Sequence, residues 1–213
     1  MTIRVLIADD HAMMRDGLKA LLSADPEFEV IGEVGNGRDT VRRAEELGPD
    51  AVILDISMPD LNGIEAARLL RERCPGVRIV MLSMHSSSEH VFRAFEAGAS
   101  AYLLKDSAGA EMKAALRAAC AGRRYLSRAI ADLDPSKRAL PARASPLERL
   151  SARERQVLQL VVEGHSSAEI ARLVHLSPKS VETYRARLMR KLGVKDVPAL
   201  VKFAIEHGLT TSG

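Results

Sequence analysis

The 213-residue chain is poor in aromatic side chains and in cysteine. It contains no Trp, and aromatic residues make up 3% of it. A sensor that encloses a small organic ligand usually has an aromatic-lined cavity, so this composition argues against that class of protein. The two cysteines, Cys74 and Cys120, stand in helix-like segments without the spacing of a metal site. We therefore expect both thiols to be reduced and structural.

Long apolar runs and an export signal are also absent from the sequence. No run approaches the roughly 18 apolar residues that a membrane-spanning helix needs. The stretch MTIRVLIADD turns acidic directly after six strand-like residues, which is unlike a signal peptide. We expect a cytoplasmic protein with no membrane partner.

Charged side chains of both signs are present but unevenly distributed. Residues 1–122 hold 19 acidic and 14 basic side chains, whereas residues 123–150 hold 3 and 7, and residues 151–213 hold 6 and 10. An acidic first half followed by a basic second half indicates two domains with different partners. The basic half is the candidate for nucleic-acid binding.

The first 122 residues alternate between strand-like and helix-like patterns. Apolar or alternating runs predict strands at 3–8, 28–34, 51–55, 77–82 and 101–104. Helical spacing of apolar residues predicts helices at 11–23, 38–47, 63–73, 87–97 and 108–121. Five strands that alternate with five helices indicate a doubly wound, five-stranded parallel sheet with helices on both faces.

Polar side chains follow four of these five strands. Asp9 and Asp10 follow the first strand, Asp55 ends the third, Ser83 follows the fourth and Lys105 follows the fifth. Because the functional groups of such a sheet gather at the carboxyl ends of its strands, we expect these side chains at one rim. Three carboxylates repel one another unless a cation offsets them, and their oxygens suit Mg²⁺. With a lysine and a hydroxyl nearby, the set suits phosphoryl transfer onto a carboxylate.

Four motifs resemble the receiver domain of two-component response regulators. They are ADDH at 8–11, LDISMP at 54–59, MLS at 81–83 and YLLKD at 102–106. They occur in the order and at the spacing of that family over residues 3–121. The resemblance implies a flavodoxin-like receiver domain at 1–122, with Asp55 as the phosphoacceptor.

The same resemblance implies a metal site around Asp55. Mg²⁺ would be held by Asp10, Asp55 and the backbone carbonyl of Ser57. Asp9 would assist them. Ser57 itself departs from the polar amide that the family often has at this position, which leaves the lifetime of the phosphoryl group open.

Further roles follow for the residues on the fourth and fifth strands. Ser83 and Lys105 would contact the phosphoryl group. Tyr102 stands at the family's aromatic switch position, which rotates inward as the hydroxyl residue moves. An ordinary core role for Tyr102 also stays open. His11 and His85 flank the site and are expected to be outer or surface residues.

Residues 123–149 predict a short helix followed by a flexible linker, because three prolines interrupt a segment with little apolar periodicity. Residues 150–213 predict four short helices whose N-caps are Ser151, Ser166, Ser177 and Asp196. The second and third helices, SSAEIARLVH and LSPKSVETYRARLMRKL, make a helix-turn-helix pattern.

The third of these helices is basic on one side. It carries five Lys or Arg and one Glu. At 100° per residue, the core side consists of Val181, Tyr184, Leu188 and Leu192, and the opposite side of Lys179, Thr183, Ala186 and Arg190. The major groove of DNA accepts such a helix. An ordinary solvated amphipathic helix has the same pattern, so the wider context must decide.

That context resembles the four-helix DNA-binding domain of the LuxR/NarL/FixJ type over residues 150–209. A later recognition-helix lysine of that family is Ala186 here, which shifts the expected base contacts toward Lys179, Glu182, Thr183 and the neighbouring arginines. The residues expected at the DNA are Ser177, Lys179, Glu182, Thr183, Ala186, Arg187, Arg190 and Lys191. The last helix has an apolar stripe. Besides its place in the core, the resemblance implies a dimer contact there through Val197, Leu200 and Val201.

Together the two halves predict a transcriptional response regulator and not an enzyme. We expect a partner sensor histidine kinase to phosphorylate Asp55, and the homodimer then to bind promoter DNA and act on the transcription machinery. The main alternative is a phosphorylation-independent LuxR-type regulator with a vestigial receiver. A phosphatase is disfavoured because Ser57 stands where a second carboxylate would be needed. The kinase, the operator and the target genes stay open.

Overall fold

The computed structural model describes residues 2–134, 146–207 and 209. The chain divides into two units, residues 1–140 and 141–213, and each is described by itself. The flexible linker expected between them falls mainly on residues 135–145, which lie outside the described residues.

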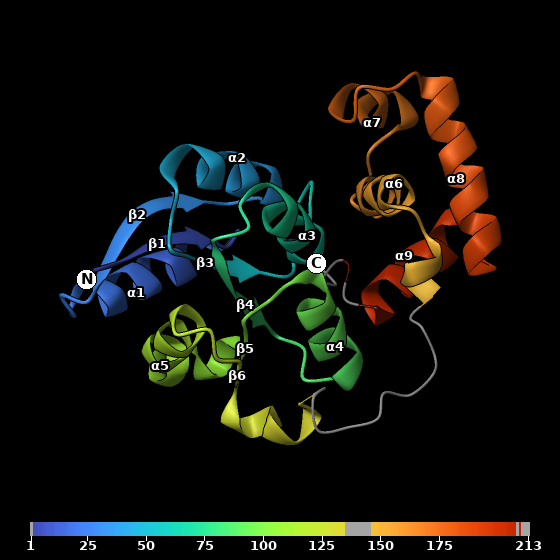
Figure 1. Ribbon diagram of the computed structural model, residues 1–213. Helices are drawn as coiled ribbons and strands as arrows, with labels where there is room; N and C mark the ends of the chain where they lie inside the picture. The colour runs from blue at the N-terminus through green and yellow to red at the C-terminus, as the bar shows by residue number, and fades with distance from the viewer. Residues whose placement is uncertain (1, 135–145, 208, 210–213) are drawn as a thin grey trace. The chain divides into compact units, whose positions relative to one another are not determined.

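The first unit is a parallel sheet with the strand order β2-β1-β3-β4-β5-β6 (Figure 1). Its strands are β1 (Ile3–Ala8), β2 (Phe28–Val34), β3 (Ala51–Asp55), β4 (Arg78–Ser83), β5 (Ala101–Leu104) and β6 (Tyr125–Leu126). Its helices are α1 (Ala12–Ser23), α2 (Gly37–Leu47), α3 (Gly63–Arg73), α4 (Ser88–Ala97) and α5 (Ala108–Cys120). The predicted doubly wound parallel fold is confirmed.

Helices cover both faces of this sheet. Helices α1 and α5 pack on one face, where Leu22 and Met112 are fully buried. Helices α2, α3 and α4 pack on the other face, where Ile64 and Val91 are buried. Every residue of β3 is buried because the strand is central and covered on both sides. Its apolar run therefore reflects two cores, one on each face.

The sheet has six strands, whereas five were expected. Tyr125 and Leu126, which lie where a short helix before the linker was expected, pair in parallel with β5. The backbone N–H of the buried Ser127 then donates to the carbonyl oxygen of Tyr102 at 2.9 Å, and its hydroxyl accepts from the N–H of Leu104 at 3.2 Å. A two-residue strand has no alternation pattern, so its pairing cannot be distinguished from a loop in the sequence. The short 3-10 helix η2 (Arg128–Leu133) follows it.

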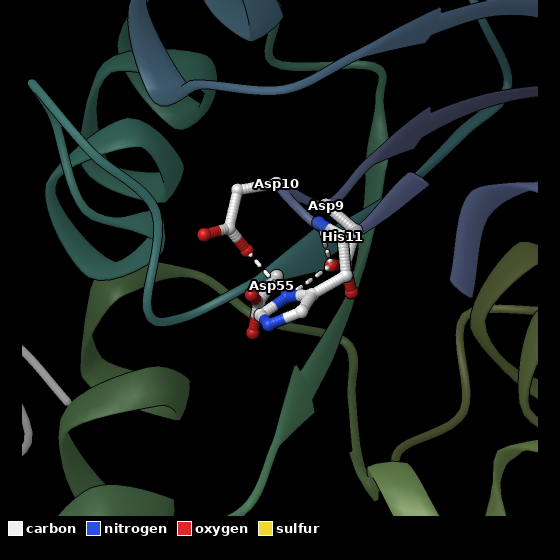
Figure 2. A group of neighbouring side chains, drawn as sticks. All are labelled: Asp9, Asp10, His11 and Asp55. Atoms are coloured by element: carbon white, nitrogen blue, oxygen red, sulfur yellow. Dashed lines mark hydrogen bonds and ion pairs between the residues drawn. The ribbon is translucent and has the colours of Figure 1, made fainter. Parts of the chain in front are cut away.

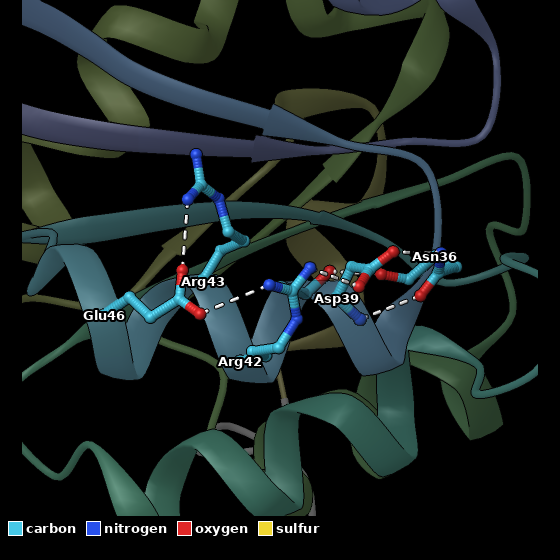
Figure 3. A network of polar contacts seen from close by, with 6 residues as sticks. Asn36, Asp39, Arg42, Arg43 and Glu46 are labelled. Carbon is cyan, nitrogen blue, oxygen red and sulfur yellow. Dashed lines mark hydrogen bonds and ion pairs between the residues drawn. The ribbon is translucent and has the colours of Figure 1, made fainter.

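The exposed side of α2 carries a chain of polar contacts (Figure 3). Asn36 caps the helix by accepting from the N–H of Asp39 at 2.8 Å. Arg42 contacts both Asp39 and Glu46, and Arg43 contacts Glu46. Exposed ion pairs of this kind contribute about 1 kcal/mol or less each. They support the helix locally and do not determine the fold.

Two glycines hold the loop between β3 and α3 against its neighbours. The N–H of Gly63 donates to the carbonyl oxygen of Ile56 at 2.9 Å. A Cβ on Gly63 would lie 2.0 Å from the carbonyl oxygen of Asp55, and one on Gly37 would lie 2.1 Å from that of Leu61. Both positions need glycine because backbone approaches so closely. The end of β3 is therefore set directly against the start of α3.

The second unit consists of the four predicted helices. They are α6 (Ala152–Val162), α7 (Ser167–Leu173), α8 (Pro178–Leu192) and α9 (Val197–Glu206), preceded by the 3-10 helix η3 (Pro146–Arg149). All four expected N-caps are present, since Ser151, Ser166, Ser177 and Asp196 each accept from the backbone N–H three residues later. The core is built from all four helices.

Gly63→Ala should destabilise the first unit, because the new methyl group would overlap the carbonyl of Asp55. Overpacking costs about 1–3 kcal/mol or more in the free energy of unfolding, which urea denaturation measures. Gly109→Ala is the matched control, because a Cβ there meets nothing within 4 Å. In the first turn of α5 it should be neutral or stabilising by up to about 1 kcal/mol. Equal stability of the two variants would contradict the close approach at Gly63.

Candidate functional site

Asp9, Asp55 and Lys105 meet at the carboxyl edge of the sheet. Asp9 follows β1, Asp55 ends β3 and Lys105 follows β5. The Nζ atom of Lys105 lies 2.8 Å from Oδ2 of Asp9 and 2.9 Å from Oδ2 of Asp55. Both carboxylates are buried, and 8% of the lysine side chain is exposed. A single ammonium group therefore bridges two buried carboxylates.

Asp10 and His11 complete the rim (Figure 2). The Nδ1 atom of His11 lies 2.7 Å from Oδ1 of Asp10 and 3.2 Å from Oδ1 of Asp9. One ligand atom from each of Asp9, Asp10, His11 and Asp55 lies within 4.8 Å of the others. The structure thus brings together the three carboxylates that the sequence places at separate strand ends.

This cluster fits a hard divalent cation. Three carboxylates against the single ammonium of Lys105 leave surplus negative charge at the rim. In the described part of the chain, the buried Oδ2 atoms of Asp9 and Asp55 accept no hydrogen bond of good geometry. Oxygen donors in this number suit Mg²⁺, which completes its shell with water. His11 at the edge of the cluster is exposed, and it would add one nitrogen ligand to the carboxylate oxygens of three aspartates.

The ionisation of Asp55 is strongly perturbed. Burial, together with the charge of Asp9, raises the pKa of Asp55 to about 6, although Lys105 and the backbone N–H of Ser57 act in the opposite direction. Burial opposes protonation of Lys105, yet the charges of Asp55 and Asp9 raise its pKa overall. The lysine is therefore cationic at neutral pH, and any added positive charge beside Asp55 would favour the carboxylate further.

Ser83 and Tyr102 hold the same residue of the loop between β4 and α4. Ser83 is buried at the end of β4, and its hydroxyl accepts from the N–H of His85 at 2.9 Å. Tyr102 is buried in β5 and donates its hydroxyl to the carbonyl oxygen of His85 at 2.7 Å. Burial raises the pKa of Tyr102 to about 12, so its hydroxyl stays a donor at neutral pH. The predicted switch pair thus shares one partner, and Tyr102 is at the same time a core residue.

The outward side of α8 carries most of the residues expected at DNA. Lys179, Thr183, Ala186, Arg187 and Arg190 are exposed, whereas the opposite side of the helix is buried in the core. The helical period therefore separates a basic exposed side from an apolar core side, as predicted. Contact of these particular residues with DNA stays a prediction.

Three other residues expected at DNA also have partners inside the unit. The hydroxyl of Ser177 caps α8. Glu182 accepts a hydrogen bond from Ser167 of α7. Lys191 lies 2.7 Å from a carboxylate oxygen of the buried Glu154, in the capping box of α6. Glu182 and Lys191 therefore also join α8 to neighbouring helices, whereas Ser177 stabilises the start of α8.

Leu200, which is expected at the dimer contact, lies in the core of its own unit. It is 1% exposed and packs in the core of its own unit, so it has no surface to offer a second copy. The apolar stripe of α9 is wide enough to serve both sides of the helix. Val197 and Val201 are half-buried, and with Pro198 and Ile205 they line a shallow apolar cavity of about 610 Å³.

Comparison with known families identifies both units. The family description "Response regulator receiver domain" matches residues 5–117, and "Bacterial regulatory proteins, luxR family" matches residues 148–204. The chain belongs to the LuxR-family response regulators. Such proteins are DNA-binding transcriptional regulators of two-component systems and not enzymes. No helix in the described part of this response regulator has the length and apolar character needed to cross a membrane.

Similar proteins match nearly the whole response regulator. It is 35% identical to the transcriptional regulatory protein MctR of Rhizobium johnstonii, over 98% of this chain and 96% of MctR. It is 33% identical to the response regulator protein VraR of Staphylococcus aureus, over 98% of this chain and 99% of VraR.

Solved structures are similar as well. A LuxR-family response regulator from Aurantimonas sp. SI85-9A1 has a TM-score of 0.61 at 36% identity, over 66% of this chain and all of that one. The RcsB–DNA complex has a TM-score of 0.60 at 26% identity, over 95% of this chain and 98% of that one.

Two contacts of the response regulator have no clear signal in its sequence. Arg15 of α1 donates from Nη1 to the carbonyl oxygen of Asp9 at 2.7 Å. Ser127 bonds to the backbone on both sides of Leu103 in β5. The proximity of Arg15 to the acidic motif along the chain is a weak hint. Ser127 has none, because its contact joins distant segments.

Asp55→Asn should change the stability of the response regulator in a pH-dependent way. The pKa of Asp55 is about 6 in the fold, above its ordinary value of 3.8. An acid with a raised pKa contributes stability that is complete below pH 3.8 and is lost as the pH rises through 6. Relative to wild type, the variant should therefore gain about 2 kcal/mol in the free energy of unfolding between pH 4 and pH 7.5.

Urea denaturation in the presence of a chelator, at both pH values, measures this gain without interference from bound metal. Asp16→Asn, the same change at an exposed carboxylate of α1, is the control and should show a constant difference from wild type. A constant difference for Asp55→Asn as well would contradict the raised pKa.

Proposed function

We propose that Asp55 accepts a phosphoryl group and that this modification controls DNA binding. The observation that carries the proposal is the buried carboxylate of Asp55 in contact with Lys105, beside Asp9 and Asp10. In the transfer, an oxygen of Asp55 bonds to phosphorus as the bond from phosphorus to the donor's leaving group breaks. The receiver family implies a partner sensor histidine kinase as the donor.

The residues around Asp55 are suited to stabilise the transfer. Mg²⁺ would be held by Asp10, Asp55 and the backbone carbonyl of Ser57, with Asp9 assisting. When bound, this ion would offset the negative charge on the transferring group. Lys105 adds a second positive charge, because its ammonium group already lies 2.9 Å from Asp55. The hydroxyl of Ser83 would donate to a phosphoryl oxygen.

The bonds from Ser83 and Tyr102 to the backbone of His85 support a way in which phosphorylation of Asp55 changes the receiver surface. If the Ser83 side chain rotates about its Cα–Cβ bond to reach a phosphoryl group, its oxygen moves away from the N–H of His85. The bond from Tyr102 to the carbonyl of the same residue then changes as well, because the loop backbone moves as one piece. The loop between β4 and α4 would reorganise, which is a local charge change with a wider effect on the receiver surface.

The second unit would use α8 to bind promoter DNA and α9 to form a homodimer. RcsB, which is similar to this chain, has been solved as dimers on DNA. The exposed basic side of α8 suits the major groove and the flanking phosphates. The apolar cavity on α9 around Val197 and Val201 supports a contact between two copies. Target genes and contacts with the transcription machinery would follow from the promoter that is bound.

Treatment with a small phosphodonor and Mg²⁺ should raise the affinity of the wild type for its selected DNA site by about 10-fold, within the usual range of coupling between two sites. Asp55→Asn should show no such increase, because it lacks the carboxylate that accepts the group. Asp16→Asn should respond like the wild type. Site selection followed by binding titrations measures the affinities, and sedimentation of the same samples reports dimer formation.

Equal DNA affinity of wild type and Asp55→Asn under every condition would overturn the phosphorylation switch. It would favour a phosphorylation-independent regulator with the same DNA-binding domain.

Substitutions on α8 should distinguish contacts with the phosphate backbone of DNA from contacts with its bases. Arg190→Ala should weaken binding to all sequences and reduce the salt slope of log affinity by about 1, because it removes one phosphate contact. Lys179→Ala and Thr183→Ala should instead change the selected sequence. Arg42→Ala on α2 of the receiver is the control and should change neither. An unchanged salt slope in Arg190→Ala would exclude this residue from the phosphate contacts.

A further inference from the structure

Arg15 reaches back from α1 to the segment that carries the acidic residues. Its Nη1 atom donates to the carbonyl oxygen of Asp9 at 2.7 Å. Its Nε atom lies 4.0 Å from a carboxylate oxygen of Glu33 in β2, and 23% of its side chain is exposed. The guanidinium group therefore sits between α1, the end of β1 and β2, next to the rim that contains Asp10.

Three polar groups of Asp9 make hydrogen bonds in this arrangement, and its Oδ2 atom makes an ion pair with Lys105. Its N–H donates to the carbonyl of Val34 at 3.2 Å. Its Oδ1 atom accepts from the N–H of His11 at 2.9 Å, and its Oδ2 atom lies 2.8 Å from Lys105. Its carbonyl oxygen is taken by Arg15. The bond from Arg15 holds the carbonyl of the peptide between Asp9 and Asp10 on the side of α1.

That peptide leads directly into Asp10. Asp10 is exposed, and the Nδ1 atom of His11 lies 2.7 Å from its Oδ1 atom. Its side chain is therefore placed by this contact and by the course of its backbone, not by buried packing. A planar guanidinium with several donors suits this task, because it bonds to a carbonyl while it also faces Glu33.

We infer that Arg15 is a positioning residue for divalent-cation binding at the Asp9, Asp10 and Asp55 cluster. It acts through the carbonyl of Asp9 and touches neither the cation nor the phosphoryl group. Outer groups that orient metal ligands commonly change metal affinity by 10–100-fold when they are replaced. This inference rests on the cation site of the proposed function and adds a residue outside the ligand set.

Arg15→Gln should weaken Mg²⁺ binding by about 10-fold, measured by titration calorimetry on the full chain without a phosphodonor. The Mg²⁺ concentration for half-maximal phosphorylation by a small phosphodonor should rise by the same factor. The maximal rate at saturating Mg²⁺ should stay within about twofold, since the reacting groups are intact. A purely structural role would lower stability without this separation of affinity from maximal rate.

Lys19→Gln is the matched control. It removes the other cation near Glu33, whose carboxylate lies 2.6 Å from Lys19, but leaves the carbonyl of Asp9 bonded. It should bind Mg²⁺ like the wild type. Arg15→Lys should restore part of the affinity, because an ammonium group donates to one carbonyl but does not reproduce the planar fork. It also provides the measurement if Arg15→Gln folds poorly.

The outcomes separate this inference from the function on which it rests. If the wild type binds Mg²⁺ and both Arg15 variants bind it equally well, the positioning role is overturned while the cation site stands. If Lys19→Gln weakens binding as much as Arg15→Gln, the general charge near β2 is responsible and the inference also fails. If the wild type binds no Mg²⁺, the cation site and the role of Arg15 are both overturned.

Discussion

The contact of Lys105 with two buried carboxylates is the interaction on which the receiver's functional edge depends. Asp9 and Asp55 are both buried, and charges taken out of water are costly unless they are paired. The partner comes from the end of β5, and β4 lies between β5 and β3 in the sheet. A long flexible side chain is needed to span that strand, whereas Ser83 on β4 reaches the same rim with a short one. The strand order thus explains the two residue types: the more distant strand supplies the long side chain, and the adjacent strand supplies the short one.

A chain of contacts leads from this edge to the segment before the linker. Ser83 and Tyr102 contact the backbone of His85 on either side of its Cα atom, through its N–H and its carbonyl oxygen. The backbone carbonyl of Tyr102 in turn accepts from Ser127. Beyond Ser127, η2 returns to the core with Ile130 buried in the same cluster as Tyr102. One tyrosine therefore contacts the loop after β4 with its side chain and the sixth strand with its backbone.

Local patterns of the sequence predict most of the elements because they have local causes. Ser151, Ser166, Ser177 and Asp196 cap helices through bonds that span three residues, so their spacing is sufficient to predict them. The strand β6 was missed because its two residues are held by a distant strand and not by any pattern of their own. The burial of Leu200 could not be predicted for a similar reason, since an apolar stripe does not reveal which of its residues face the core.

From the sequence alone we predict the alternation of strands and helices, the residues at the strand ends and the division into an acidic and a basic half. Chain order and residue type are enough for these predictions, because parallel strands with helical crossovers present their carboxyl ends at one edge. Three contacts appear only in the folded protein: Lys105 bridges Asp9 and Asp55, Ser83 and Tyr102 both bond to His85, and Arg15 turns back to Asp9. Most of these contacts join residues that are far apart in the sequence. Their geometry depends on how the strands and helices pack together.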